Sequence, residues 1–204
     1  MPVGASVTHG VGSSDQSGYR KPLLEMLQSN GFNVRFVGSR HAGDFPNNEH
    51  EGWRGFRIDQ IEPRGKASAE EHQPHVFTVN AGSNDCIQDY KPEEAGLRLS
   101  SFLETLWSAS PGSTIILSSL IINRDDAIDL RIRGFNEEIK RTAGAMGAEG
   151  KKVVFVDMHG SDGPLVGDLV EDGTHPDDEG YAKMASIWFQ GIKAASNQGF
   201  LPTA

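Results

Sequence analysis

Short runs rich in β-branched and aromatic residues alternate along the chain with longer amphipathic segments. Four of these runs are bounded by Gly, Pro, Asn or Ser, and they predict β-strands over 32–38, 75–82, 113–121 and 151–158. A first strand is expected over residues 1–6, mainly because a polar, Gly-rich loop follows it.

Apolar residues at helical spacing predict helices over 20–29, 93–109, 127–148 and 177–197. Between the second and third strands the pattern is mixed. A short helix is expected near 56–63, and the charged stretch GKASAEEHQ that follows is expected to be a connector.

Strands that alternate with helices indicate βαβ units and a parallel sheet that is covered on both faces. Five strands predict an α/β fold of the flavodoxin-like kind, a three-layer α/β/α sandwich with a five-stranded parallel sheet in the order 2-1-3-4-5. The 204 residues suit one domain that spans 1–204. In such folds ligands bind beyond the carboxyl ends of the strands.

The net charge of −9 argues against nucleic acid or an anionic membrane as the main partner, because both require a basic face. It fits a neutral substrate better than a polyanion. No apolar run approaches the ~20 residues of a membrane span. Cys86 is the single cysteine, so no intramolecular disulfide forms.

A possible triad lies in the loops at the expected carboxyl edge. The stretch DGTHP places Asp172 and His175 three residues apart, with Gly173 to permit a tight turn. Ser6 falls where the first strand gives way to its loop. If these loops meet, Ser6 is the nucleophile, His175 is the general base, and Asp172 orients the imidazole.

Acyl transfer also requires donors for the oxyanion. The side-chain amide of Asn84 in NAGSND, the N–H of Gly55 in HEGWRGF and the N–H of Ser6 are the candidates, with Gly52 as a rival to Gly55. Trp53 lies beside Gly55, where it is expected either to stack on a sugar or to pack a loop.

Other polar residues have competing interpretations. His9 is close to Ser6 in sequence, but a loop position three residues away points it elsewhere. Asp157 and His159 form a second acid–imidazole pair, interpreted as a structural hydrogen bond. His50 lies next to a glutamate, yet no third ligand stands at a recognisable spacing, so neither a metal nor a cofactor is expected.

Six blocks carry a family resemblance: GASVTHG, GYRKPLLEML, FVGS, HEGWRGF, NAGSND and DGTHPDDEGY. In this order they resemble the blocks of the SGNH (GDSL-type) hydrolases, and most of all the fungal acetylxylan esterases of carbohydrate esterase family 3. The resemblance implies an SGNH hydrolase fold with Ser6 as nucleophile and Asp172 with His175 as its partners. It also implies oxyanion roles for Gly55 and Asn84.

The same resemblance implies a substrate and a compartment. It predicts a serine esterase that removes O-acetyl groups from xylan or a related plant polysaccharide, acting as a secreted, monomeric enzyme. The first block of the family contains a methionine like Met1, so a trimmed secreted domain is expected. Two alternatives stay open: a lysophospholipase or thioesterase with the same triad, and a non-enzymatic flavodoxin-like module that binds FMN or phosphate.

One position departs from the family pattern. The first block usually reads GDS, whereas Ala5 stands here in place of the aspartate. A carboxylate that would hydrogen-bond the loop is therefore missing. A less preorganised loop is expected, and not an inactive enzyme.

Overall fold

Six strands form one sheet in the order β2-β3-β1-β4-β5-β6 in the computed structural model, which describes residues 1–202. The strands are β1 (Pro2–Gly4), β2 (Arg40–His41), β3 (Glu49–Gly52), β4 (Val76–Asn80), β5 (Thr114–Ser118) and β6 (Val153–Val156). All neighbours pair in parallel except β2, which runs antiparallel to β3 at the edge. The five parallel strands have the predicted order 2-1-3-4-5, so the predicted fold class is confirmed, with one additional edge strand.

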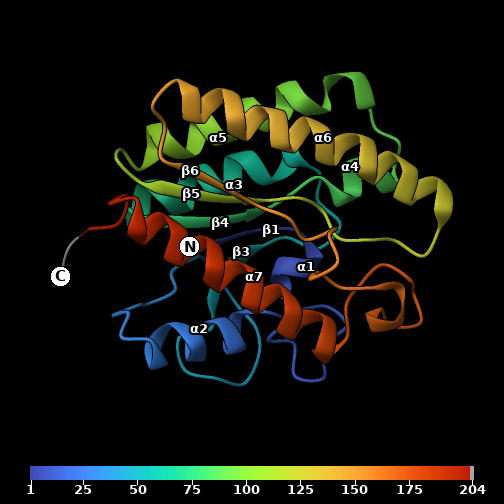
Figure 1. Ribbon diagram of the computed structural model, residues 1–204, viewed down its shortest axis with the longest axis horizontal. Coiled ribbons are helices and arrows are strands. Elements are labelled where there is room, and N and C mark those ends of the chain that lie inside the picture. Colours follow the sequence, from blue (N-terminus) through green and yellow to red (C-terminus); the bar gives the residue numbers. More distant parts are fainter. Residues whose placement is uncertain (203–204) are drawn as a thin grey trace.

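Helices cover both faces of this sheet (Figure 1). Helices α3, α5 and α6 pack in one core cluster, and α2 and α7 pack in the other. The helices are α1 (Ser6–His9), α2 (Arg20–Ser29), α3 (Ile58–His72), α4 (Ser83–Ile87), α5 (Ala95–Ala109), α6 (Asp126–Ala148) and α7 (Asp178–Asn197), with 3₁₀ turns at Pro92–Glu94 and Val166–Asp168. The helices predicted over 20–29, 93–109, 127–148 and 177–197 are thus confirmed.

Strand β5, which lies between β4 and β6, contributes side chains to both cores. Ile115 and Leu117 belong to the cluster under α3, α5 and α6, whereas Ile116 belongs to the cluster under α2 and α7. This division follows from the strand itself, because successive side chains point to opposite faces of a sheet. The continuous apolar run in the sequence therefore indicated a strand that is buried on both sides.

The strand predicted over 32–38 is wrong. These residues are extended, and Phe36 is buried, but they pair with no strand. The Asn47 side chain makes the hydrogen bonds that a neighbouring strand would make. It accepts the Phe36 N–H at 2.6 Å and donates to the Phe36 carbonyl at 2.7 Å. The alternating apolar residues do reach the core, which is why the segment resembled a strand.

The second parallel strand is instead β3, with the sequence EHEG. His50 and Glu51 are fully buried although both are polar. His50 Nδ1 accepts the Gly52 N–H at 2.8 Å, and Glu51 accepts the Ser39 N–H and the Trp53 indole N–H at 2.5 and 2.8 Å. Hydrogen bonds thus pair His50 Nδ1 and the Glu51 carboxylate, whereas His50 Nε2 is buried without a partner within residues 1–202. A hydrophobic pattern gives no sign of this strand.

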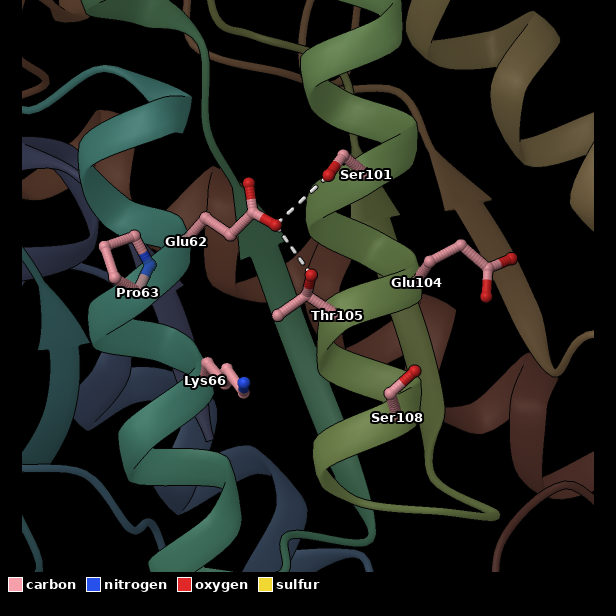
Figure 2. A pocket seen from close by; sticks show the side chains of 7 residues that line it. All are labelled: Glu62, Pro63, Lys66, Ser101, Glu104, Thr105 and Ser108. Atoms are coloured by element: carbon pink, nitrogen blue, oxygen red, sulfur yellow. Dashed lines mark hydrogen bonds between the residues drawn. The ribbon is translucent and has the colours of Figure 1, made fainter.

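The short helix expected near 56–63 is also wrong in length, because α3 continues through the stretch predicted to be a connector. Its charged residues lie on the exposed face. Gly65 faces α5, where an added Cβ would lie 3.2 Å from the Phe102 ring. Glu62 joins the same two helices by accepting hydrogen bonds from Ser101 and Thr105 at 3.1 and 2.6 Å, in a polar groove between α3 and α5 (Figure 2).

No helix within residues 1–202 combines the length and apolarity that crossing a membrane requires. Helix α7 is long but amphipathic. It packs on the sheet through Gly191, where a Cβ would lie 2.6 Å from Val156 Cγ1 and 2.8 Å from Ile116 Cγ2. The absence of a side chain at Gly191 therefore sets how closely α7 approaches β5 and β6.

Gly191→Ala is expected to destabilise the fold by about 1–3 kcal/mol, because β-branched neighbours cannot turn away from the new methyl group. The matched control is Gly134→Ala on α6, whose Cβ would meet no atom within 4 Å. This variant is expected to gain up to about 1 kcal/mol from helix propensity. Urea unfolding measures both, and equal stability of the two variants would contradict the close packing of α7.

Candidate active site

Three loops leave the sheet at the same level. Gly4 at the end of β1 pairs in register with Gly52 of β3 and with Asn80 of β4. A Cβ at Gly4 would lie 2.1 Å from the Asn80 carbonyl oxygen and 2.4 Å from Thr8 Oγ1, so only glycine permits this approach. The Trp53 N–H then donates to the Gly4 carbonyl at 2.9 Å. The residues that follow β1, β3 and β4 therefore meet at one edge.

Ser6, His175 and Asp172 form a continuous chain of hydrogen bonds at this edge. The Ser6 hydroxyl donates to His175 Nε2 at 2.7 Å, and His175 Nδ1 donates to Asp172 Oδ2 at 2.6 Å. This pattern assigns the imidazole proton to Nδ1. The fold thus brings together side chains that are 169 positions apart in the sequence. Such a pairing is the geometry in which an imidazole can take a proton from a serine hydroxyl.

The Asp172 carboxylate is fixed on its other oxygen. Oδ1 accepts the N–H groups of Thr174 and His175 at 2.9 and 3.0 Å. Partial burial raises the pKa of Asp172, but the hydrogen bonds from the His175 ring and from these N–H groups outweigh it and hold the pKa below its ordinary value. Asp172 is therefore ionised at neutral pH and can stabilise an imidazolium.

A buried arginine holds the loop that follows Ser6. Arg20 is fully buried, and its guanidinium donates to the carbonyl oxygens of Thr8, His9, Gln16 and Asn48 at 3.0, 2.9, 2.8 and 2.8 Å. Burial lowers the pKa of Arg20 to about 10, so the group stays charged at neutral pH. No motif predicts this role, because the partners of Arg20 are backbone carbonyls.

A second arginine holds the loop that carries His175. Arg124 donates through Nη2 to the Leu169 carbonyl at 3.0 Å and through Nη1 to the Glu171 carbonyl at 3.1 Å. Its backbone N–H donates to the Gly173 carbonyl at 2.9 Å. Gly173 has φ +70° and lies against Arg124, so the predicted requirement for glycine in this turn is met.

The neighbouring Asn123 connects the same loop to α6. Its amide donates to Thr174 Oγ1 at 3.1 Å, and its own N–H donates to Asp129 Oδ1 at 3.0 Å. The His159 ring binds Asp129 at 3.0 Å, whereas Asp157 accepts the backbone N–H of His159 at 2.9 Å. The acid–imidazole pair noted in the sequence therefore serves structure, although the ring itself binds a different carboxylate.

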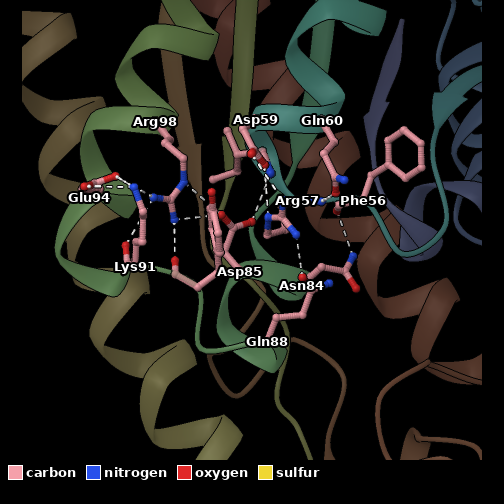
Figure 3. A network of polar contacts seen from close by, with 12 residues as sticks. Phe56, Arg57, Asp59, Gln60, Asn84, Asp85, Gln88, Lys91, Glu94 and Arg98 are labelled. Atoms are coloured by element: carbon pink, nitrogen blue, oxygen red, sulfur yellow. Dashed lines mark hydrogen bonds and ion pairs between the residues drawn. The ribbon is translucent and has the colours of Figure 1, made fainter.

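The predicted oxyanion donors lie on the loops beside Ser6. The Asn84 amide donates one hydrogen to the Phe56 carbonyl at 2.9 Å, which orients the group and leaves its second hydrogen for a ligand (Figure 3). Gly55 is exposed with φ +78°, and its N–H has no hydrogen-bond partner within residues 1–202. The N–H of its rival Gly52 is occupied by His50. Ser6 is the first residue of α1, where an N–H has no intrahelical partner.

The loop that carries Asn84 is anchored by an ion pair. Asp85 accepts the Ile58 N–H at 3.0 Å and pairs with Arg98 at 3.0 Å, which joins α4 to the start of α3 and to α5 (Figure 3). Burial raises the pKa of Asp85, although the Ile58 N–H and Arg98 act in the opposite direction. Asn84 is thus presented from a rigid element.

The other candidate residues, His9 as a base and Trp53 as a sugar platform, pack against neighbouring aromatic rings. His9 is buried and lies edge-on to His50, with ring centroids 5.2 Å apart. Burial lowers the pKa of His9, and the nearby positive charge of Arg54 lowers it further. Trp53 is half-buried and stacks on Phe56 at 5.5 Å, which favours the packing interpretation over an open sugar platform.

Ala5 is buried at the N-cap of α1, and its side chain caps no helix N–H. The expected loss of a loop hydrogen bond at this position stays a prediction. Within residues 1–202, no group of three or more metal-binding side chains is present.

Residues 3–183 match the GDSL-like Lipase/Acylhydrolase family. The chain belongs to this family. Membership confirms the predicted SGNH resemblance and the prediction of a carboxylic ester hydrolase. It also sets aside the alternative of a non-enzymatic FMN-binding or phosphate-binding module.

Similar proteins include other esterases. A multidomain esterase from Ruminococcus flavefaciens is 27% identical over 222 aligned positions, which cover 95% of this chain and 28% of that protein. This GDSL-like hydrolase thus spans little more than a quarter of that relative. The Clostridium thermocellum family 3 carbohydrate esterase is 28% identical, with a TM-score of 0.87 over 97% of this chain and 96% of that chain. A family 3 carbohydrate esterase from Talaromyces cellulolyticus has the same fold, with 21% identity and a TM-score of 0.83 over 97% of both chains.

Arg124→Met is expected to lower the kcat of this GDSL-like hydrolase by about 10- to 100-fold with little change in KM, because a loosened loop misplaces His175 without removing it. Arg124→Lys keeps the charge but cannot reach both carbonyls, so an intermediate kcat is expected. Arg35→Met is the control, since the Arg35 guanidinium is 79% exposed and its contact with Glu49 is 3.8 Å. Steady-state kinetics on a soluble acetyl ester measures kcat and KM for each variant. A wild-type kcat for Arg124→Met would contradict the role of Arg124 in positioning His175.

Proposed function

We propose that this chain is a serine esterase that removes O-acetyl groups from xylan or a related plant polysaccharide through an acyl-enzyme. The observation that carries the proposal is the hydrogen-bond chain Ser6–His175–Asp172, with distances of 2.7 and 2.6 Å. The similar proteins support the acetyl-polysaccharide part, because two of them are family 3 carbohydrate esterases. Secretion and a monomeric state stay predictions.

The first half of the proposed reaction acylates the serine. Ser6 Oγ attacks the ester carbonyl while its proton moves to His175 Nε2, and the ionised Asp172 stabilises the imidazolium. The oxyanion of the tetrahedral intermediate is bound by the N–H groups of Ser6 and Gly55 and by the Asn84 amide. His175 then gives its proton to the leaving sugar hydroxyl as the ester C–O bond breaks.

The second half releases the acid. A water molecule takes the place of the alcohol and loses a proton to His175 Nε2 as it attacks the acyl-enzyme. The same three donors bind the second oxyanion. Collapse of this intermediate returns the proton to Ser6 Oγ and frees acetate. His175 thus serves as base and acid in turn, which requires the Nδ1–H to remain bound to Asp172.

Ser6→Ala is expected to lower kcat for p-nitrophenyl acetate by about 10³- to 10⁶-fold, because no other group can form the acyl-enzyme. Ser14→Ala is the matched control. Ser14 lies on the same loop with an exposed side chain, and its N–H, which binds Asp178 at 2.9 Å, is unchanged by the substitution. Activity retained by Ser6→Ala would overturn the assignment.

The acyl group and the leaving group are tested separately. Acetyl esters are expected to have a higher kcat/KM than octanoyl esters, because the proposed substrate carries acetyl groups and a long acyl chain would require an apolar channel. A preference for octanoyl would favour the lysophospholipase or thioesterase alternative.

Acetate release from acetylated xylan is expected to exceed release from a non-carbohydrate acetyl ester, and the reverse order would contradict the polysaccharide assignment.

A further inference from the structure

Three arginines lie on the loop that carries the proposed oxyanion donor Gly55 or against the ring of its Trp53. Arg54 is exposed and directly precedes Gly55. The guanidinium carbons of Arg40 and Arg64 lie 4.4 and 4.9 Å from the centre of the Trp53 ring, so the indole holds both groups in place. We name Arg40, Arg54 and Arg64 the arginine rim.

The arginine rim is unpaired within residues 1–202. None of its three side chains makes a hydrogen bond or approaches a carboxylate within 4.0 Å there, and Arg40 Nε is buried without a partner. Other arginines of the same region differ in this respect, since Arg57 pairs with Asp59 at 3.2 Å. The buried carboxylate of Glu51 accepts the Trp53 indole N–H and leaves the three guanidiniums free to bind a ligand.

The rim adjoins the proposed nucleophile. The Trp53 N–H binds the carbonyl of Gly4 at 2.9 Å, and Ser6 follows Gly4 by two residues. Arg54 directly follows Trp53 and is exposed, so it lies at the same edge of the sheet. The positive charge of the rim acts on the nearby His9. Burial lowers the pKa of His9 most, and the charges of Arg54 and Arg40 lower it further.

This local charge is opposite in sign to that of the whole protein, which is −9. Acidity elsewhere would repel a polyanion at long range, but it does not neutralise three unpaired guanidiniums at one place. A guanidinium presents a planar fork of N–H donors that matches the two oxygens of a carboxylate. In a polysaccharide, such a group is the carboxylate of a uronic acid.

We propose that the arginine rim binds the carboxylate of a uronic acid unit in the acetylated polysaccharide, next to the sugar whose acetyl group is removed. The proposal rests on the proposed function and names its substrate class more closely. The carboxylate is carried either by a side group on a neutral backbone or by the backbone itself.

The experiment compares three acetylated oligosaccharides: neutral xylo-oligosaccharides, xylo-oligosaccharides with glucuronic acid side groups, and oligogalacturonides. The wild-type enzyme is expected to show a lower KM for an acidic than for the neutral oligosaccharide. The difference should shrink as ionic strength rises from about 0.01 to about 0.15 M, because the screening length falls from about 30 to about 8 Å. The acidic oligosaccharide with the lower KM identifies whether the carboxylate is on a side group or on the backbone.

Variants then test the residues. Arg54→Gln is expected to raise the ratio of acidic to neutral KM by about two- to fivefold, as expected for one exposed ion pair, and Arg54→Gln with Arg64→Gln by about tenfold. Arg141→Gln is the control, because Arg141 is an exposed arginine of α6 whose only ion pair within residues 1–202 is with Glu138. Its KM ratio should equal that of the wild type.

Direct binding separates this proposal from the esterase assignment. Calorimetry with deacetylated glucuronic-acid xylo-oligosaccharide and with deacetylated oligogalacturonide needs no turnover, and Arg54→Gln should weaken whichever binds. Binding that depends on Arg54 in a chain inactive on every acetyl ester would keep the site and overturn the esterase. An active esterase with equal KM for acidic and neutral substrates, or with an unchanged ratio in Arg54→Gln, would overturn the site alone.

Discussion

The interior charge of Arg20 is the constraint on which the site depends. Transfer of a guanidinium out of water costs several kcal/mol, and within residues 1–202 no carboxylate lies within 4.0 Å of Arg20 to form an ion pair. Four carbonyl oxygens accept its hydrogen bonds instead, from the end of α1, from the loop after it and from the residue before β3. Loss of Arg20 would therefore leave four carbonyl acceptors without this partner, two of them buried, and would release the loop after β1 and the segment that enters β3.

The two halves of the site are held by the same kind of interaction. Arg20 binds carbonyls around the Ser6 loop, and Arg124 binds carbonyls around the His175 loop. Neither a guanidinium nor a peptide carbonyl changes its charge between acid and neutral pH. These two sets of contacts therefore keep their charges as the solution is acidified, whereas the pKa of Asp172 is held below its ordinary value by its own hydrogen bonds.

Much of the fold could be predicted from the sequence, since helices such as α2 and α7 bury one apolar stripe and strands such as β5 bury both faces. The predicted triad was placed by short motifs at strand exits together with a family resemblance. Strand β3 could not be predicted, because its buried residues His50 and Glu51 are polar and the Glu51 carboxylate is paired by the Ser39 N–H of another segment. Arg20 and Arg124 were missed for a similar reason. Their partners are backbone carbonyls of other segments, and every residue has a carbonyl, so no residue type indicates which ones are bound.

Strand β1 lies in the middle of the sheet, between β3 and β4, although it precedes both of them in the sequence. During synthesis on the ribosome, the serine emerges long before the imidazole that it must meet. A chain that stops before the DGTHP loop therefore has the proposed nucleophile without its proposed base. On the proposed mechanism, such an incomplete chain cannot form an acyl-enzyme, because no imidazole is present to take the proton of Ser6.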